Sequence, residues 1–132
     1  MNIKLASTIL RVVLGIIFLA HGIDKLRMGL GNVAGWFESI HVPGFAAYLV
    51  GPIELLGGLL LIIGLFTRYV SAVLAVVMLG AIFTAKLSVG LLGNGGYELD
   101  LALLAIAVFL VLANPESWSL DRLFREKGAP KR

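Results

Sequence analysis

Hydrophobic residues along this chain are concentrated in four long runs, and the segments between them carry most of the charges. The runs cover about residues 5–23, 46–66, 69–85 and 99–113. A helix needs about 20 mostly apolar residues to cross a bilayer, and about 17 residues still reach about 25 Å at about 1.5 Å per residue. None of the runs shows the alternation of barrel strands, the other structure that satisfies its backbone in lipid. The pattern therefore predicts four membrane-spanning helices.

The connections between these runs predict two further short helices. Between the first two runs, apolar residues over 33–40 recur at helical spacing before the break at Val42-Pro43-Gly44. We expect an amphipathic helix on the outer membrane interface here, anchored by Trp36. Residues 117–125 mix apolar and charged side chains in a similar way, which predicts an inner interfacial helix.

Small residues and one short turn predict how the helices pack. Glycines recur in the first two spans and at the end of the second, at Gly15, Gly22, Gly51, Gly57, Gly58 and Gly64. They should allow two helices to approach closely. Thr67-Arg68 forms only a tight turn, so the second and third spans should be antiparallel neighbours. No linker-like segment divides the chain, so we expect one domain over residues 1–132, an all-α, four-helix integral membrane bundle with short interfacial helices.

The positions of the basic residues predict the orientation in the membrane. With the N-terminus inside, eight of them fall on the inner side and three on the outer side. The inner set is Lys4, Arg11, Arg68, Arg122, Arg125, Lys127, Lys131 and Arg132, and the outer set is Lys25, Arg27 and Lys86. Because basic residues are enriched in cytoplasmic loops, we expect both termini in the cytoplasm. Arg11 lies within the first span, and we expect its long side chain to extend to the inner surface.

Composition supports a membrane protein and excludes several kinds of site. Of the 132 residues, 59% are hydrophobic and 14% are charged, against about 25% charged in soluble domains. There is no cysteine, which excludes disulfides, thiol catalysis and iron–sulfur ligation within the chain. The two histidines, His21 and His41, form no HxxH or HxxE pair, so we expect no metal site. A basic tail is typical of a cytoplasmic end of a membrane protein, so we expect the lipid bilayer and no nucleic acid as a partner.

Glu54 is the most informative polar residue, because it lies inside the second apolar run. A carboxylate at mid-membrane costs about 2.5–3.5 kcal/mol to insert, so it normally faces a partner, a cavity or a ligand. Pro52 lies two residues before it and should leave a helix carbonyl without its usual N–H donor. Glu54 is therefore either the structural partner of Lys25 or Lys86, or a functional group such as a proton relay.

Further ionisable residues lie at the helix ends that this topology places on the outer side. His21, Asp24 and Lys25 are spaced i, i+3 and i+4 and share one helix face. Glu98 and Asp100 open the fourth span, where acidic residues also interact favourably with the helix dipole. These charges either terminate their helices or converge on one polar site. The predicted substrate-binding residues of that site are His21, Asp24, Lys25, Glu54, Lys86 and Glu98.

Four stretches of the chain resemble the DoxX family of small bacterial membrane proteins. They are Phe18-Leu19-Ala20-His21-Gly22-Ile23-Asp24-Lys25-Leu26, Gly51-Pro52-Ile53-Glu54-Leu55-Leu56-Gly57-Gly58 through Gly64-Leu65-Phe66-Thr67-Arg68, Gly95-Gly96-Tyr97-Glu98, and Ser119-Leu120-Asp121-Arg122. The chain is most similar to the compact members that are labelled oxidoreductases. The resemblance implies a four-helix protein of the bacterial inner membrane and redox chemistry around quinones, usually with partners. His21, Lys25, Glu54 and Glu98 fall in the family's recurrent motifs, for which the resemblance implies no established catalytic mechanism.

Three functions fit these observations. The first is a quinone-linked oxidoreductase subunit, or an accessory factor in defence against quinone and oxidative stress, in which His21 or Lys25 donates to a quinone carbonyl and Glu54 relays protons. The chain supplies no cofactor of its own, so we expect quinone as the redox molecule and assembly with a redox partner or further copies of the chain. The second is a small transporter or exporter of an aromatic or lipophilic compound. The third is a membrane scaffold that recruits a soluble oxidoreductase through its basic C-terminal segment.

Overall fold

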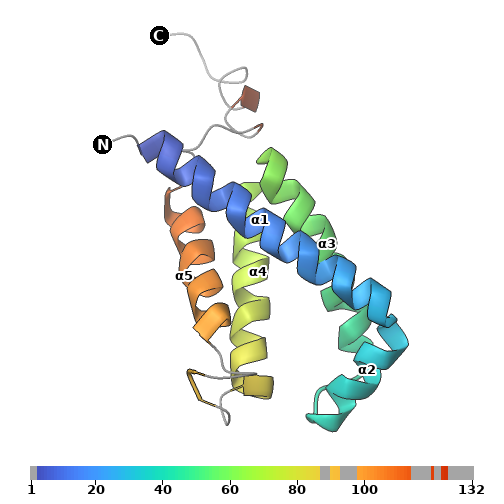
Figure 1. The fold of residues 1–132 in the computed structure, drawn as a ribbon. Coiled ribbons are helices and arrows are strands. Elements are labelled where there is room, and N and C mark those ends of the chain that lie inside the picture. The colour runs from blue at the N-terminus through green and yellow to red at the C-terminus, as the bar shows by residue number, and fades with distance from the viewer. Residues whose placement is uncertain (1–2, 87–89, 93–97, 114–119, 121–122, 125–132) are drawn as a thin grey trace, which may run out of the picture.

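The computed structural model describes residues 3–86, 90–92, 98–113, 120 and 123–124, with the side chains of Ala85 and Lys86 left out. Every regular element in these residues is a helix (Figure 1). The elements are α1 (Ile3–Met28), α2 (Leu30–Ser39), α3 (Phe45–Ile63), α4 (Thr67–Ala81), the π-helical turn η1 (Ile82–Lys86) and α5 (Glu98–Ala113). The all-helical prediction is confirmed for this part of the chain.

Three of the helical segments are long and apolar enough to cross a membrane: Ile3–Met28, Phe45–Ile63 and Thr67–Thr84. α5 has 16 residues, so a fourth span stays a prediction. α1 continues to Met28, past the apolar run that ends at about residue 23, so Asp24 and Lys25 lie on this helix as their spacing predicted. α3 ends at Ile63 rather than residue 66, because Gly64 adopts the left-handed conformation that commonly terminates helices, with φ 77°.

α1 and α3 cross in close contact, and glycines on both helices permit this. A Cβ atom added at Gly15 would lie 2.8 Å from the carbonyl oxygen of Gly58, and one at Gly58 would lie 2.7 Å from the carbonyl oxygen of Gly15. One added at Gly22 would lie 2.5 Å from the backbone nitrogen of Leu55. Backbone therefore packs directly on backbone at two levels of the crossing, as small residues allow between membrane helices. The predicted close approach is confirmed for these glycines.

Arg11 stabilises the same helix pair by capping the end of α3. Its side chain is 2% exposed, and one guanidinium nitrogen donates to the carbonyl oxygens of Leu61 and, at 3.0 Å, Ile62. The last four carbonyls of a helix lack intrahelical donors, and a cation is favourable at this end of the helix dipole. The expectation that Arg11 would extend to the membrane surface is therefore wrong. The carbonyls at the end of α3 lie within reach, so its charge is satisfied inside the protein.

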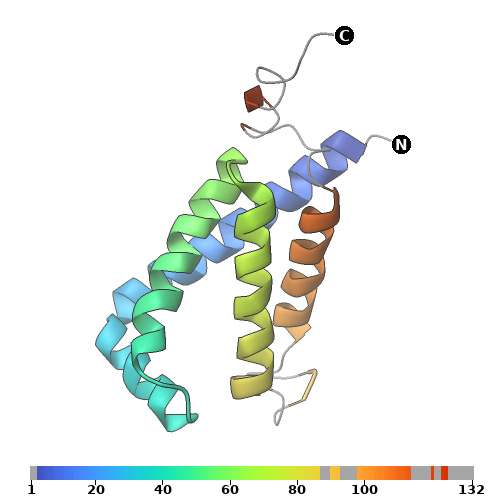
Figure 2. The same ribbon diagram turned by 180° about the vertical axis from the view of Figure 1, so that it is seen from behind.

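α3 and α4 are joined at one end and separated at the other. A tight turn at Gly64–Phe66 connects them, and the two helices diverge away from it (Figure 2). α5 packs along α4, and their shared core with α1 and α3 includes Leu14, Phe18, Leu61, Leu74 and Leu103. We call the end that holds the Gly64–Phe66 turn the turn end, and the opposite end the α2 end.

α2 confirms the short helix predicted in the first connection, and its contacts explain its position. Val33, Ala34 and Phe37 are buried and form a separate small core with Ala47 of α3. Trp36, the predicted membrane anchor, is 50% exposed, and its ring lies 5.6 Å from that of Phe37. α2 therefore packs against the first half of α3 at the α2 end. Most of the second predicted interfacial helix, over 117–125, lies outside the described residues.

The glycine crossing predicts a large difference between two identical substitutions. Gly58→Ala places a methyl group against the backbone of α1, whereas an added Cβ at Gly80 on α4 meets nothing within 4 Å. We expect Gly58→Ala to lower the free energy of unfolding by about 1–3 kcal/mol, since overpacking forces the helices apart. Gly80→Ala should be neutral or stabilising by up to about 1 kcal/mol. Denaturant titration in detergent, followed by circular dichroism, measures both; equal stabilities would contradict the close crossing.

The cap at the end of α3 predicts a second stability effect. Arg11→Met removes the donor to two helix carbonyls, and we expect a loss of about 1.5–3 kcal/mol in the same titration. Arg11→Lys keeps a charged donor and should recover part of this loss. A methionine variant as stable as the wild type would show that the cap contributes little.

Candidate functional site

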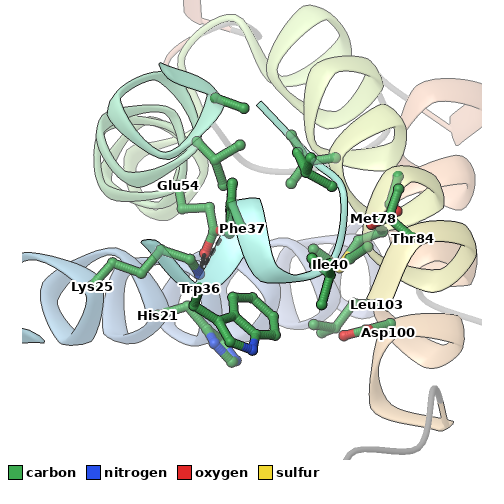
Figure 3. A pocket seen from close by; sticks show the side chains of 16 residues that line it. His21, Lys25, Trp36, Phe37, Ile40, Glu54, Met78, Thr84, Asp100 and Leu103 are labelled. Atoms are coloured by element: carbon green, nitrogen blue, oxygen red, sulfur yellow. Dashed lines mark hydrogen bonds and ion pairs between the residues drawn. The ribbon is translucent and has the colours of Figure 1, made fainter. Parts of the chain in front are cut away.

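A cavity of about 270 Å³ lies near the α2 end, where α4 has diverged from α3. Side chains from all five α-helices line it. Its apolar wall includes Trp36, Phe37, Val50, Met78 and Leu103. Its polar groups are His21, Lys25, Glu54, Thr84 and Asp100 (Figure 3). The space is thus mainly apolar, with a few polar side chains contributed by different helices, as is typical of small-molecule sites.

An ion pair between α1 and α3 forms one end of the cavity. The Lys25 Nζ atom lies 3.0 Å from Oε1 and 3.1 Å from Oε2 of Glu54 (Figure 3). The Glu54 side chain is 4% exposed and that of Lys25 is 20% exposed. The contact follows from the helix crossing, because Gly22 packs on Leu55, the residue after Glu54. Of the two partners that the sequence suggested for Glu54, the structure places Lys25 in contact with it.

This pair accounts for the stability of a carboxylate at this depth. A buried charge without a partner is very costly, whereas a well-placed pair recovers much of the desolvation penalty. The Lys25 ammonium has three N–H donors, and the two carboxylate oxygens of Glu54 accept from at most two of them at these distances. It can therefore hold Glu54 and still donate to a molecule in the cavity.

His21 and Trp36 lie at the more open edge of the cavity. His21 precedes Lys25 by one helical turn on α1, so the two side chains share a face. Both His21 and Trp36 are exposed while also lining the cavity. Chemically, an imidazole can give or take up a proton, and an indole offers a flat apolar surface against which a ring can pack.

Asp100 was expected among the ionisable residues at the outer helix ends but was left out of the predicted substrate-binding residues. It was assigned to the start of a helix, yet its side chain is 5% exposed and lines the cavity from α5. The helical spacing of the sequence could have indicated that Asp100 faces inward. Asp100 precedes Leu103, Ala107 and Leu110 by 3, 7 and 10 positions, and all four are buried on one face of α5.

Two of the remaining predicted site residues do not line this cavity. Asp24 and Glu98 are exposed and do not line it. Successive residues of an α-helix point about 100° apart, so Asp24 lies on the flank of α1 when its neighbour Lys25 faces the cavity. Lys86 belongs to η1 by its backbone, but its side chain lies outside the described part of the chain. Within the described residues there is no group of three metal-ligating side chains, and the expectation of no metal site stays a prediction.

Comparison with known sequences identifies the family. The sequence model of the DoxX family matches residues 6–87, from α1 through η1. The chain belongs to the DoxX family. The match contains His21, Lys25 and Glu54, whereas Asp100 lies beyond it. The resemblance seen in the sequence motifs is thereby confirmed.

Curated relatives agree with this DoxX assignment over most of their length. The Bacillus subtilis protein named "Putative oxidoreductase CatD" is 38% identical over 120 residues, covering 91% of this chain and 87% of the relative. An uncharacterized membrane protein of Mycobacterium tuberculosis is 36% identical, covering 90% of this chain and 81% of the relative. No solved structure matches the chain. The protein is therefore a DoxX-family membrane protein with a relative named as an oxidoreductase.

Glu54 is more deeply buried than Lys25, so replacing each partner of the ion pair should lower the stability by a different amount. Lys25→Met leaves Glu54 buried without its cation, and we expect a loss of about 3 kcal/mol in unfolding free energy. Glu54→Gln leaves Lys25, which reaches solvent more easily, and should cost about 1 kcal/mol. The double variant should lose less than the sum of the single losses. Asp24→Asn on the exposed flank is the matched control, and additive losses from the two substitutions would argue against a direct interaction.

Proposed function

We propose that this DoxX-family protein binds the ring of a quinone or quinol in the cavity and exchanges protons with it, as the membrane subunit of an oxidoreductase system. The observation that carries the proposal is the Lys25–Glu54 pair facing an apolar cavity of about 270 Å³. The name of the Bacillus subtilis relative supports a redox role.

The size and walls of the cavity favour a single aromatic ring. Small-molecule sites in proteins typically enclose about 300–1,000 Å³, so this cavity lies just below the usual range. A dinucleotide is too large for it. Trp36 and Phe37 on α2 can pack against a flat ring, while Met78 on α4 adapts to its shape. A quinone tail can extend into the lipid, so only the head group needs to fit.

The polar end of the cavity suits the proton chemistry of such a ring. Reduction of a quinone to a quinol consumes two electrons and two protons, one at each carbonyl oxygen. Lys25 and His21 donate hydrogen bonds to the nearer oxygen, and Glu54 takes up or returns its proton. The electrons come from a partner oxidoreductase that carries a flavin or metal centre, since the sequence offers no cysteine for an iron–sulfur cluster. The DoxX chain thus supplies binding and protonation, and its partner supplies the electrons.

The same proposal includes the membrane orientation. Eight basic residues on one side and three on the other favour an inner-membrane protein with both termini in the cytoplasm. In that orientation the α2 end and the cavity face outward. The partner that supplies the electrons must then reach the cavity from the outer side or within the membrane, because the basic C-terminal segment lies on the opposite, cytoplasmic side.

Binding of a quinone with a short alkyl tail tests the proposal. We expect the purified protein in nanodiscs to bind its reduced, quinol form, and Glu54→Gln to weaken that binding by about 10-fold, since the quinol hydroxyl loses a charged acceptor. Asp24→Asn, on the same side but outside the cavity, should bind like the wild type. Wild-type affinity in a folded Glu54→Gln variant would refute the site, and quinone-independent uptake of an aromatic compound into vesicles would favour a transporter instead.

A further inference from the structure

The packing of α3 against α4 changes along the length of the two helices. Nearer the turn end they touch, because a Cβ atom added at Gly57 of α3 would lie 3.4 Å from side-chain atoms of Val70 and Leu74 on α4. Toward the α2 end, Gly80 of α4 lines the cavity, and a Cβ atom added there would meet nothing within 4 Å in the described part of the chain. Direct packing of the two helices is therefore lost at the level of the cavity.

Val50 and Gly80 lie at the same level on either side of this space. Val50 precedes the last residue of α3 by 13 positions, and Gly80 follows the first residue of α4 by 13 positions. At about 1.5 Å per residue, both lie about 20 Å along their helices from the turn that joins them. Both line the cavity, together with Ala46, Val77 and Ala81, whose short side chains are only partly buried. The side chains at this level are thus too small to close the space between the helices.

The outer surface next to this space is apolar. Leu49 on α3 and Val76 and Phe83 on α4 are exposed and do not line the cavity. All three belong to segments that are long and apolar enough to cross a membrane, so their side chains suit the hydrocarbon of the bilayer. The edge of the cavity at His21 and Trp36 differs, because an imidazole is exposed there. The cavity therefore borders an apolar surface on one side and a polar edge on another.

We propose that the cavity opens to the hydrocarbon of the bilayer between Val50 and Gly80, and that its ligand is a quinol whose alkyl tail lies in this opening. The ring is held at the Lys25–Glu54 pair, and the tail passes between α3 and α4 into the lipid. Its methylene groups then stay out of water, which favours binding in proportion to the apolar area that is buried. Departure past His21 would expose them to a polar edge. This inference rests on the proposed function, because it assumes that the ring binds in the cavity.

Photolabelling of the wild type locates the tail without any variant. A quinol that carries a diazirine near the ring end of a decyl tail is bound in nanodiscs without oxygen and irradiated, and the labelled residues are identified by mass spectrometry. We expect labelling of Val50, Val77 and Gly80 that an excess of the unlabelled quinol suppresses. Suppressible labelling confined to Trp36 and Ile40 would place the tail at the polar edge and overturn the inference.

A bulky side chain in the opening provides a second test. Gly80→Leu should fold, because an added side chain has space there, and should weaken binding of the decyl quinol by about 10-fold, since the leucine occupies the place of the first methylene groups. The same head group with a methyl group in place of the tail should bind within about twofold of the wild type. Gly35→Leu is the matched control, because Gly35 on α2 also has nothing within 4 Å of an added Cβ in the described residues but does not line the cavity. It should leave both affinities unchanged. A folded Gly80→Leu variant that binds the decyl quinol like the wild type, or loses both ligands equally, would contradict the opening.

The same measurements separate this inference from the function on which it rests. If the wild type binds the decyl quinol and Glu54→Gln weakens that binding, but the label lies on α2, the quinone site stands and the opening between α3 and α4 is refuted. If the wild type binds neither the decyl quinol nor its methyl counterpart, both proposals fail.

Discussion

The direct contact of α1 with α3 is the constraint on which the rest of the structure depends. Gly15, Gly22 and Gly58 remove the side chains that would hold these helices apart. Backbone contact fixes the rotation of both helices about their axes, and the rotation of α1 aims Lys25 at Glu54. Bulky residues at the crossing would separate the helices and with them the two charges. A packing detail of membrane helices therefore decides whether an acid can be retained below the protein surface.

The divergence of α3 and α4 matters as much as the close contact of α1 with α3. Their short connection at Gly64–Phe66 holds them together at the turn end, and both helices contribute to the shared core. At the α2 end the space between them is bounded by α2 on one side and by α5 on the other. The bundle thus combines a close-packed half, which supplies stability, with an open half, which supplies a site.

Much of this arrangement follows from the sequence, for physical reasons that individual residues illustrate. Long apolar runs specify helices in lipid, and a carboxylate within one of them requires a polar partner, so the sequence narrowed the partner of Glu54 to Lys25 or Lys86 and the structure places Lys25 there. Arg11 was misplaced because its outcome depends on whether helix carbonyls or solvent come within reach, which a sequence does not state. Asp100 was left out of the predicted binding residues because the first turn of a helix explains an acidic residue equally well whether it faces outward, like Glu98, or inward.

The Arg11 cap has a consequence for motion within the bundle. It ties α1 to the final turn of α3, immediately before the loop that leads into α4. Three helices are thereby fastened at one place, and that place is far from the cavity along the bundle. A motion that admits a ligand should then be a hinge-like separation of the helices, with its pivot at the Arg11 cap and its largest displacement near α2.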